Sequence, residues 1–168
     1  MKKFILLIAI LTAAGWWYFV GGRRISEDHV TRFYQEFEAA TLSRNPDALC
    51  ALLSDDFETS GTVEIGGQTG TSKQNKTQTC RAYAAMYENF EKLGDKMGGM
   101  LQLDSSYEIN SIEIQPGRKS AIVDFSSSLD VAGTIMNIHS RSMDTLIRRN
   151  GKTLMLRSEG RGSMSSGG

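Results

Sequence analysis

Hydrophobic residues recur with helical spacing in three separate segments after residue 25. The first segment follows Ser26, a good helix-capping residue, and ends at Arg44. The second starts at Asn45 and Pro46, and the third follows Ser72. Side chains three and four positions apart share one face of a helix, so each segment predicts an amphipathic helix. The three apolar stripes are Val30, Phe33, Tyr34, Phe37 and Thr41; Leu49, Leu52 and Leu53; and Tyr83, Met86, Tyr87, Phe90 and Leu93.

A period of two replaces the helical period in five other segments and predicts strands. The first strand is expected from Phe57 to Ile65. The other four follow residue 102 and are separated by tight turns such as Pro116-Gly117 and Asn150-Gly151, which favour hairpins. These four strands are residues 103–115, 119–131, 134–149, and a last strand that holds Leu154 and Leu156.

Two of these strands break their own alternation. The apolar residues change face after Ile109, and they change face again after Ile138. Because a regular strand keeps each parity on one face, such a change indicates an inserted residue. We therefore predict one β-bulge near Asn110-Ser111 and another within His139 to Ser142, and a strongly bent sheet.

The order of these elements predicts an α+β domain, in which a curved antiparallel sheet wraps around about three helices. We place this domain at residues 26–159, after an N-terminal segment of residues 1–25. Residues 160–168 are rich in Gly and Ser and lack apolar side chains apart from Met164, which is typical of a flexible tail.

The N-terminal segment has the pattern of a membrane anchor. An apolar run from Phe4 to Val20 is flanked by Lys2-Lys3 and Arg23-Arg24, and it contains Trp16-Trp17-Tyr18, residues typical of the membrane interface. About 17 residues rise roughly 25 Å as a helix, which is near the lower limit for spanning a bilayer core. We expect a single uncleaved span in a bacterial inner membrane, with the bulk of the chain periplasmic or extracellular.

Two other interpretations of this segment stay open. Small residues at Thr12, Ala13 and Ala14 would suit a signal peptidase, and cleavage there would release a secreted protein. The run could also be a buried helix of the soluble domain, although it is apolar around its whole circumference.

The composition excludes several classes of protein. Lys and Arg number 19, as do Asp and Glu, so the chain lacks the overall positive charge that attracts nucleic acid. The hydrophobic fraction of 40% excludes wholesale disorder. The sequence has no Cys or His cluster with metal-ligand spacing, no Gly-rich phosphate loop and no nucleophile elbow. We therefore predict no nucleic-acid partner, no metal and no cofactor.

Three features carry a family resemblance: the segment from Asn45 to Phe57, the glycine turn before the third helix, and the final turn Arg149-Asn150-Gly151-Lys152. With the order of elements, they resemble the nuclear transport factor 2-like superfamily, which includes ketosteroid isomerases and SnoaL-like polyketide cyclases. The resemblance covers residues 26–159. It implies a cone, similar to a cystatin-like roll, with a pocket between sheet and helices. Cystatin-like sheets are the nearest alternative, but they need no third long helix after the first strand.

If the pocket is catalytic, the resemblance implies a carboxylate that moves a proton beside a carbonyl, and a Tyr or neutral acid that holds the developing oxyanion. The alternation of residues 119–131 turns Asp124 away from the apolar face. The groups available for such chemistry are Tyr34, Tyr83, Tyr87, Asp124, His139, Arg141 and Asp144.

From this set we predict that Tyr34, Tyr83, Tyr87, His139 and Arg141 line the ligand pocket, and we assign no catalytic residue. Core packing is the alternative for Tyr83 and Tyr87, and a surface position is the alternative for His139.

Cys50 on the second predicted helix and Cys80 on the third are the two cysteines of the chain. In an exported domain such a pair favours a disulfide bond. Two buried thiols are the alternative.

Lys and Arg outnumber Asp and Glu between Arg141 and Arg161, which makes the last hairpin basic. This hairpin could face anionic lipid head groups or a partner, or acidic helices could neutralise it.

We expect a membrane-tethered extracytoplasmic domain that binds a small apolar ligand or serves in assembly. A SnoaL-like or ketosteroid-isomerase-like enzyme for a small apolar substrate is one alternative. A structural subunit of an envelope or secretion complex, or a homodimer, joined through the sheet face is another.

Overall fold

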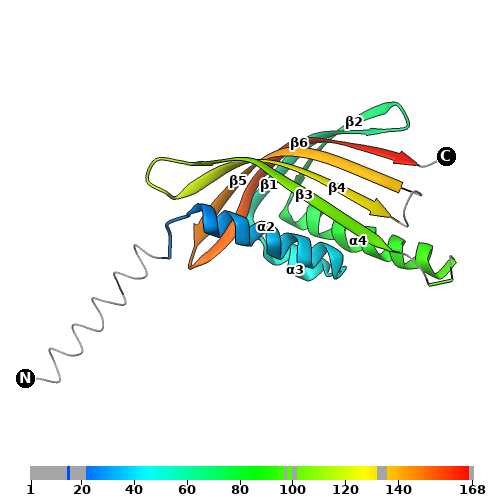
Figure 1. Cartoon of the computed structure of the whole chain (residues 1–168), viewed down its shortest axis with the longest axis horizontal. Coiled ribbons are helices and arrows are strands. Elements are labelled where there is room, and N and C mark those ends of the chain that lie inside the picture. The colour runs from blue at the N-terminus through cyan, green and yellow to red at the C-terminus, as the bar shows by residue number, and fades with distance from the viewer. Residues whose placement is uncertain (1–14, 16–21, 97, 100–101, 132–135, 167–168) are drawn as a thin grey trace, which may run out of the picture.

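The computed structural model describes residues 15, 22–96, 98–99, 102–131 and 136–166 (Figure 1). Apart from Gly15, the predicted anchor of residues 4–20 lies outside these ranges. No helix within the described part of the chain combines the length and the apolar character needed to cross a membrane. The helices are α2 (Glu27–Leu42), α3 (Pro46–Ala51) and α4 (Lys76–Lys96), and the strands are β1 (Leu53–Ile65), β2 (Gln68–Asn75), β3 (Leu103–Ile114), β4 (Ser120–Val131), β5 (Met136–Arg149) and β6 (Lys152–Ser166).

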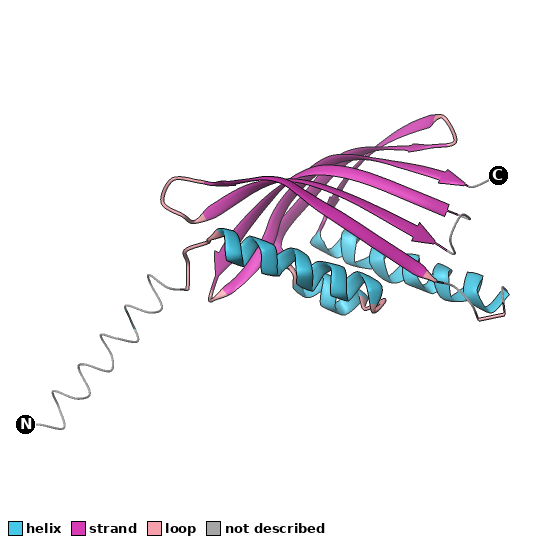
Figure 2. Ribbon diagram, in the orientation of Figure 1, coloured by secondary structure: helices cyan, strands magenta, loops and turns pink. Residues whose placement is uncertain are grey.

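The strands form one six-stranded sheet in the order β2-β1-β6-β5-β4-β3. Figure 2 shows that this sheet curves strongly and that the three helices lie on its concave side. The predicted α+β fold, with a curved sheet around three helices, is confirmed. One detail differs, because β1 and β6 run parallel whereas all other neighbours are antiparallel.

The core lies between the concave face and the helices. Alternate residues of β4, among them Ala121, Val123 and Phe125, are buried on this face. Phe33 and Tyr34 from the apolar stripe of α2 pack against them. A second cluster at the far end of α2 joins Ala40, Leu49, Tyr87, Phe90 and Val131.

Asparagine residues set the starts of α3 and α4. The Asn45 side chain accepts a 3.0 Å hydrogen bond from the amide of Ala48, as expected for a helix cap. Asn75 and Gln78 cap each other, since each amide donates to the other side chain at 3.0 Å. The third helix, which the sequence pattern places directly after Ser72, therefore begins only at Lys76.

Ser72 lies instead in β2, a strand that the sequence pattern did not predict. Residues 68–75 contain no large apolar side chain and are almost entirely exposed, so they carry no visible period of two. Backbone pairing with β1, from Glu58↔Asn75 to Ile65↔Gln68, makes this segment a strand. Pairing also lengthens β1, which begins at Leu53 because Leu53 pairs with Met155 of β6.

The predicted flexible tail is also corrected. Residues 160–166 continue β6, with β1 on one side and β5 on the other. Hydrogen bonds to two neighbouring strands thus order a Gly-Ser-rich segment that has little apolar surface of its own.

The first predicted bulge is confirmed, because the pairing of β3 with β4 shifts between Ile109 and Ser111. The second is wrong, since β5 pairs without a shift through residues 139–142 with both neighbours. The shift in the β5–β6 pairing comes after Thr145, where Leu156 of β6 has no partner residue.

Two facing glycines allow the sheet to bend at its centre. Gly61 of β1 pairs with Gly160 of β6 on the concave face. A Cβ atom at Gly61 would overlap the carbonyl oxygen of Gly160, and one at Gly160 would lie 2.5 Å from the carbonyl oxygen of Arg141. The three strands therefore approach more closely here than side chains would allow.

Candidate functional site

A buried carboxyl group lies on the concave face of the sheet. Asp144 of β5 is 1% exposed. The Tyr34 hydroxyl of α2 donates a hydrogen bond of 2.8 Å to its Oδ2 atom. The Ser158 hydroxyl of β6 donates one of 2.7 Å to its Oδ1 atom. A helix and a neighbouring strand thus each supply a donor to one oxygen of this group.

Burial and hydrogen bonding act in opposite directions on the pKa of Asp144. Burial raises the pKa of this carboxyl, while hydrogen bonds from Ser158, Tyr34 and Ser142 oppose the shift. Burial and the neighbouring Asp144 also raise the pKa of the Tyr34 hydroxyl, which therefore remains a donor. A carboxyl group with a raised pKa can take up or release a proton closer to neutral pH than an exposed one.

A cavity of about 430 Å³ lies beside Asp144, between the concave face and the helices α2 and α4. One wall of this main cavity is aromatic. The Tyr34 ring stacks on the ring of Phe125 with centroids 4.3 Å apart. The aromatic side chains in this wall are Tyr34, Phe37, Phe57, Tyr83 and Phe125.

The opposite wall is lined by small hydroxyl side chains and glycines. The Ser127 and Ser140 hydroxyls are 2.8 Å apart and share a hydrogen bond. Glycine at positions 61, 160 and 162 leaves this part of the concave face without side chains, so the curvature glycines also make room for the cavity. The hydroxyl side chains of this wall include Thr59, Ser72, Ser127, Ser140, Ser142 and Ser158.

A smaller cavity of about 250 Å³ adjoins the main one. The two share Tyr34, Phe37, Tyr83, Phe125, Ser127, Ile138 and Ser140. The smaller cavity adds Tyr87 and Tyr107, so its lining is largely aromatic and aliphatic. A ligand longer than the main cavity would therefore extend over apolar side chains.

Four of the five predicted pocket residues, Tyr34, Tyr83, Tyr87 and Arg141, line these cavities, and His139 does not. Tyr34 and Tyr83 line both of them, and Tyr87 lines the smaller one. The Tyr87 hydroxyl donates a 3.1 Å hydrogen bond to the carbonyl oxygen of Thr41 and so ties α4 to α2. Burial raises the pKa of Tyr83, which keeps its hydroxyl protonated.

His139 and the charged group of Arg141 lie elsewhere. Both occupy odd-numbered positions of β5, which face the convex side of the sheet, away from the helices. The Arg141 guanidinium pairs there with Asp124 at 2.6 Å, although Arg141 also contributes to the wall of the main cavity. His139 is exposed and lines a separate hollow of about 330 Å³.

The residue at the centre of the site is Asp144, which was among the available acids but not in the predicted lining. Ser158 was not predicted at all. The even-numbered positions of β5, Ile138, Ser140, Ser142, Asp144 and Leu146, share the concave face. A regular strand drawn through Ile138 and Leu146 would have placed Asp144 in the pocket.

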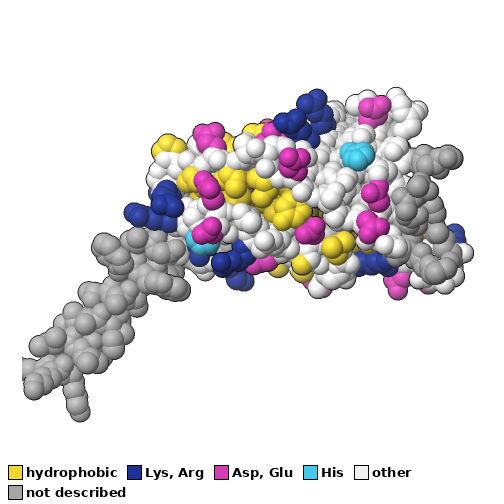
Figure 3. All heavy atoms as spheres, in the orientation of Figure 1, with side chains coloured by type: hydrophobic (Ala, Val, Ile, Leu, Met, Phe, Trp, Pro, Cys, Tyr) yellow, Lys and Arg dark blue, Asp and Glu magenta, His cyan; other side chains and the backbone are white. Residues whose placement is uncertain are grey.

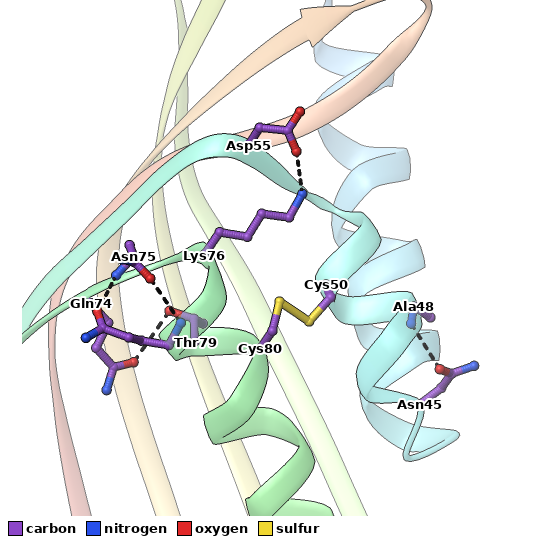
Figure 4. The surroundings of a disulfide bond; sticks show 10 residues. Asn45, Ala48, Cys50, Asp55, Gln74, Asn75, Lys76, Thr79 and Cys80 are labelled. Carbon is purple, nitrogen blue, oxygen red and sulfur yellow. Dashed lines mark hydrogen bonds and ion pairs between the residues drawn. A yellow bond between two sulfur atoms is a disulfide. The ribbon is translucent and has the colours of Figure 1, made fainter.

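A disulfide bond supports the helix side of the site. Cys50 of α3 and Cys80 of α4 are bonded, with Cα atoms 5.5 Å apart (Figure 4). The ammonium group of Lys76 forms an ion pair of 2.9 Å with Asp55 at the start of β1 in the same region. Both contacts fix the first turns of α4, the helix that carries Tyr83.

The described residues contain no group of three or more His, Cys, Asp or Glu side chains that could hold a metal ion. What the arrangement offers is a protonatable carboxyl, two hydroxyl donors, and an aromatic wall. These groups can bind a polar atom of a ligand, and they can exchange a proton with it.

No protein-family model matches the chain, and no curated protein matches it. Solved structures do match. A ketosteroid isomerase-like protein from Erwinia carotovora atroseptica has 16% sequence identity and a TM-score of 0.53, covering 83% of this chain and 95% of its own. A scytalone dehydratase-like protein from Novosphingobium aromaticivorans has 15% identity and a TM-score of 0.56, covering 83% and 86%.

A third similar structure is an NTF-2 like protein of unknown function from Silicibacter pomeroyi. It has 16% identity and a TM-score of 0.52, covering 80% of this chain and 92% of its own. At these identities the likeness concerns the backbone. From helix order, sheet order and these structures together, the chain has the nuclear transport factor 2-like fold.

Proposed function

We propose that this chain is a membrane-tethered domain outside the cytoplasm that binds a small ligand in the main cavity. The observation that carries the proposal is the buried carboxyl of Asp144, held by Tyr34 and Ser158 in the wall of a 430 Å³ cavity. Ligand pockets in proteins have volumes of about 300 to 1,000 Å³ and combine apolar walls with a few polar groups.

The lining defines the chemistry of the ligand. The aromatic wall suits a flat ring system, while the serine-rich wall suits hydroxyl or carbonyl groups at its edge. The small apolar ligand expected from the sequence is therefore refined to a ring compound with at least one polar group that reaches Asp144.

The proposal can be tested with 2-naphthol and naphthalene as probes for the full-length chain in detergent. We expect 2-naphthol to shift the backbone amide resonances of Ser142 and Ser158, and naphthalene, which lacks the hydroxyl, to bind more weakly. Ser140→Leu should fill the cavity and abolish binding, while Ser106→Leu on the convex face should not. Equal binding to both Leu variants would contradict a site in the main cavity.

Proton-transfer catalysis is the second candidate function. It is favoured by the raised pKa of Asp144, whose carboxyl Tyr34 and Ser158 hold in a fixed position by hydrogen bonds. It also fits the ketosteroid isomerase-like and dehydratase-like proteins that share the fold. The test is exchange of the α-protons of 2-tetralone in D₂O, followed by proton NMR. Asp144→Asn should abolish any exchange above the background rate, and exchange that survives this change would exclude Asp144 as the base.

Assembly through the sheet face is the third candidate, as a homodimer or in an envelope complex. The described part of the convex face leaves one large hydrophobic side chain exposed, Met143. Polar contacts cover its neighbourhood, including the Arg141–Asp124 ion pair and bonds from Asn110 to Asp124 and Ser126. Because obligate interfaces bury apolar surface, this face gives assembly less support than the cavity gives ligand binding.

The membrane tether rests on the sequence of residues 4–20. We expect the full-length protein to stay in the membrane fraction after washes with high salt and carbonate. Release by these washes, or a mature N-terminus near Gly15 in mass spectrometry, would replace the tether with a cleaved signal.

A further inference from the structure

A second hollow in the molecule lies at the end of the domain where the chain enters α2. This groove has a volume of about 420 Å³ and lies between α2, α3 and the turn that joins β5 to β6. It shares no lining residue with the main cavity. Its charged and titratable lining residues are His29, Arg32, Glu36, Arg148 and Lys152.

The three cations of this groove lack carboxylate partners. Within the described residues, neither Arg32 nor Arg148 nor Lys152 forms an ion pair. The Nε atom of Arg148 is buried and has no hydrogen-bond partner. Glu36 is the one acidic side chain in the lining. A buried donor without a partner costs free energy, which a bound anion would recover.

The cations also repel one another. Burial and the nearby Arg32 lower the pKa of Arg148. Burial, Arg148, Arg32 and Arg118 lower the pKa of His29, while Asp28 opposes the shift. Figure 3 shows several Lys and Arg side chains, with one His, at this end of the domain. The positive groups are thus close enough to act on a single anion.

Two other arginines of β5 do pair with carboxylates. Arg149, the next residue along, makes two hydrogen bonds of 2.8 and 2.9 Å to the carboxylate of Asp56. Arg141 makes two to Asp124. The cations of the groove differ from these two arginines because they have no carboxylate partner, and because three of them line one hollow together.

The groove also lies beside the point where the predicted anchor meets the domain. The amide of Gly151, in the β5–β6 turn, donates a 3.0 Å hydrogen bond to the carbonyl oxygen of Gly22. Gly22 is the second residue after the apolar run that ends at Val20. A tether of this kind would hold the groove at the lipid surface, within the roughly 10 Å over which the charge of head groups acts.

We propose that this groove binds the phosphate of an anionic phospholipid head group, with Arg32, Arg148 and Lys152 as the contacting cations. The inference rests on the proposed membrane tether for the source of the phosphate. Such a contact would fix the orientation of the domain on the membrane, because it adds a second attachment point next to the first.

The experiment uses the full-length chain in zwitterionic dodecylphosphocholine micelles, so that it does not depend on whether residues 4–20 span a bilayer. Dihexanoyl phosphatidylglycerol is titrated in, and the amide resonances of Gly151 and Lys152 are followed by NMR. We expect saturable shifts that dihexanoyl phosphatidylcholine does not produce. Arg32→Gln and Lys152→Gln, both at exposed positions, should each weaken binding about fivefold.

Arg161→Gln is the matched control, because it removes the same charge at the other end of β6. If this variant weakens binding of the lipid equally, the lipid is attracted only by the overall charge of the protein, and the proposed site is overturned. Inorganic phosphate that saturates the groove at the same concentration as the lipid would show a free-anion site and overturn the lipid assignment. Absence of shifts at Gly151 would overturn both. If the carbonate wash described above releases the protein from membranes, the proposed tether fails. The groove is still tested in that case, because the micelle titration measures lipid binding directly.

Discussion

Tyr34 and Asp144 lie 110 positions apart in the sequence and are joined by a hydrogen bond of 2.8 Å inside the core. The bond connects α2 to the concave face of the sheet, so one polar contact links the two layers of the fold. Both side chains are 1% exposed, so removing one partner leaves the other as a buried polar group with one hydrogen bond fewer.

Tyr34→Phe should therefore destabilise the domain by about 2 kcal/mol, because it leaves one oxygen of a buried carboxyl without its donor. The measurement is urea unfolding at neutral pH. Tyr87→Phe is the control, since the Tyr87 hydroxyl bonds only a neutral backbone carbonyl and its loss should cost about 1 kcal/mol. Equal losses in the two variants would argue against a special role for the carboxyl.

Asp144 should give the stability of the domain a distinctive pH dependence. Its pKa is raised in the folded state, so the folded protein binds more protons than the unfolded chain above the ordinary carboxyl pKa of 3.8. The free energy of unfolding that this group contributes is thus greatest in acid and is lost as the pH rises through the folded-state pKa.

The measurement is the difference in unfolding free energy between the wild type and Asp144→Asn from pH 4 to pH 8. We expect the difference to move in favour of the Asn variant as the pH rises. Other carboxyls, such as Asp56, whose pKa the Arg149 guanidinium lowers to about 2, affect both proteins equally and cancel. Parallel stability curves would contradict the raised pKa.

The bond between Cys50 and Cys80 should be a main source of stability. It closes a loop of 30 residues, which on the chain-entropy model is worth about 3 to 4 kcal/mol. Cys50→Ser should lower the melting temperature by roughly 10 °C, and a reducing agent should do the same to the wild type. A reducing agent should have no further effect on the variant. A wild-type melting temperature that reduction leaves unchanged would speak for two buried thiols.

Gly61→Ala should destabilise the sheet by about 2 kcal/mol or more, because the new Cβ would overlap the backbone of Gly160. Gly70→Ala is the matched control on the adjacent strand β2. No atom lies within 4 Å of a Cβ there, and alanine is the better strand residue by about 0.5 kcal/mol. Thermal unfolding of the two variants compares the effects, and a stable Gly61→Ala protein would show that the sheet can flatten.

The helices were predictable because each has a clear apolar stripe. The strand β3 was predictable because its apolar residues alternate, and the break in this alternation marks its bulge. The strand β2 and the end of β6 were not, since backbone pairing with neighbours holds them and their side chains are small or polar. The Gly and Ser content of residues 160–168 led to the prediction that they form a flexible tail.

The site was missed for a related reason. The shared parity of Met143 and Ile147 led to the predicted bulge within residues 139–142, and a strand with that bulge would place Asp144 on the face opposite these two residues. In the structure the two apolar residues occupy odd-numbered positions on the convex side, and β5 is regular there. The parity of apolar residues was thus a misleading guide in β5, where the buried acid Asp144 lies on the concave face and Ile147, on the other face, is 9% exposed.

The parallel pairing of β1 with β6 governs the order in which the domain can be completed. The hairpin of β1 and β2 is made early, yet it can join the rest of the sheet only through the last strand of the chain. When the ribosome has released the chain up to the end of β5, the sheet therefore consists of two parts, β1–β2 and β3–β5, that share no backbone hydrogen bonds. One edge of β1 and one edge of β5 stay unpaired until β6 is made. Removing residues 160–166 would therefore take away part of a central strand of the sheet and leave both of its edge strands in place.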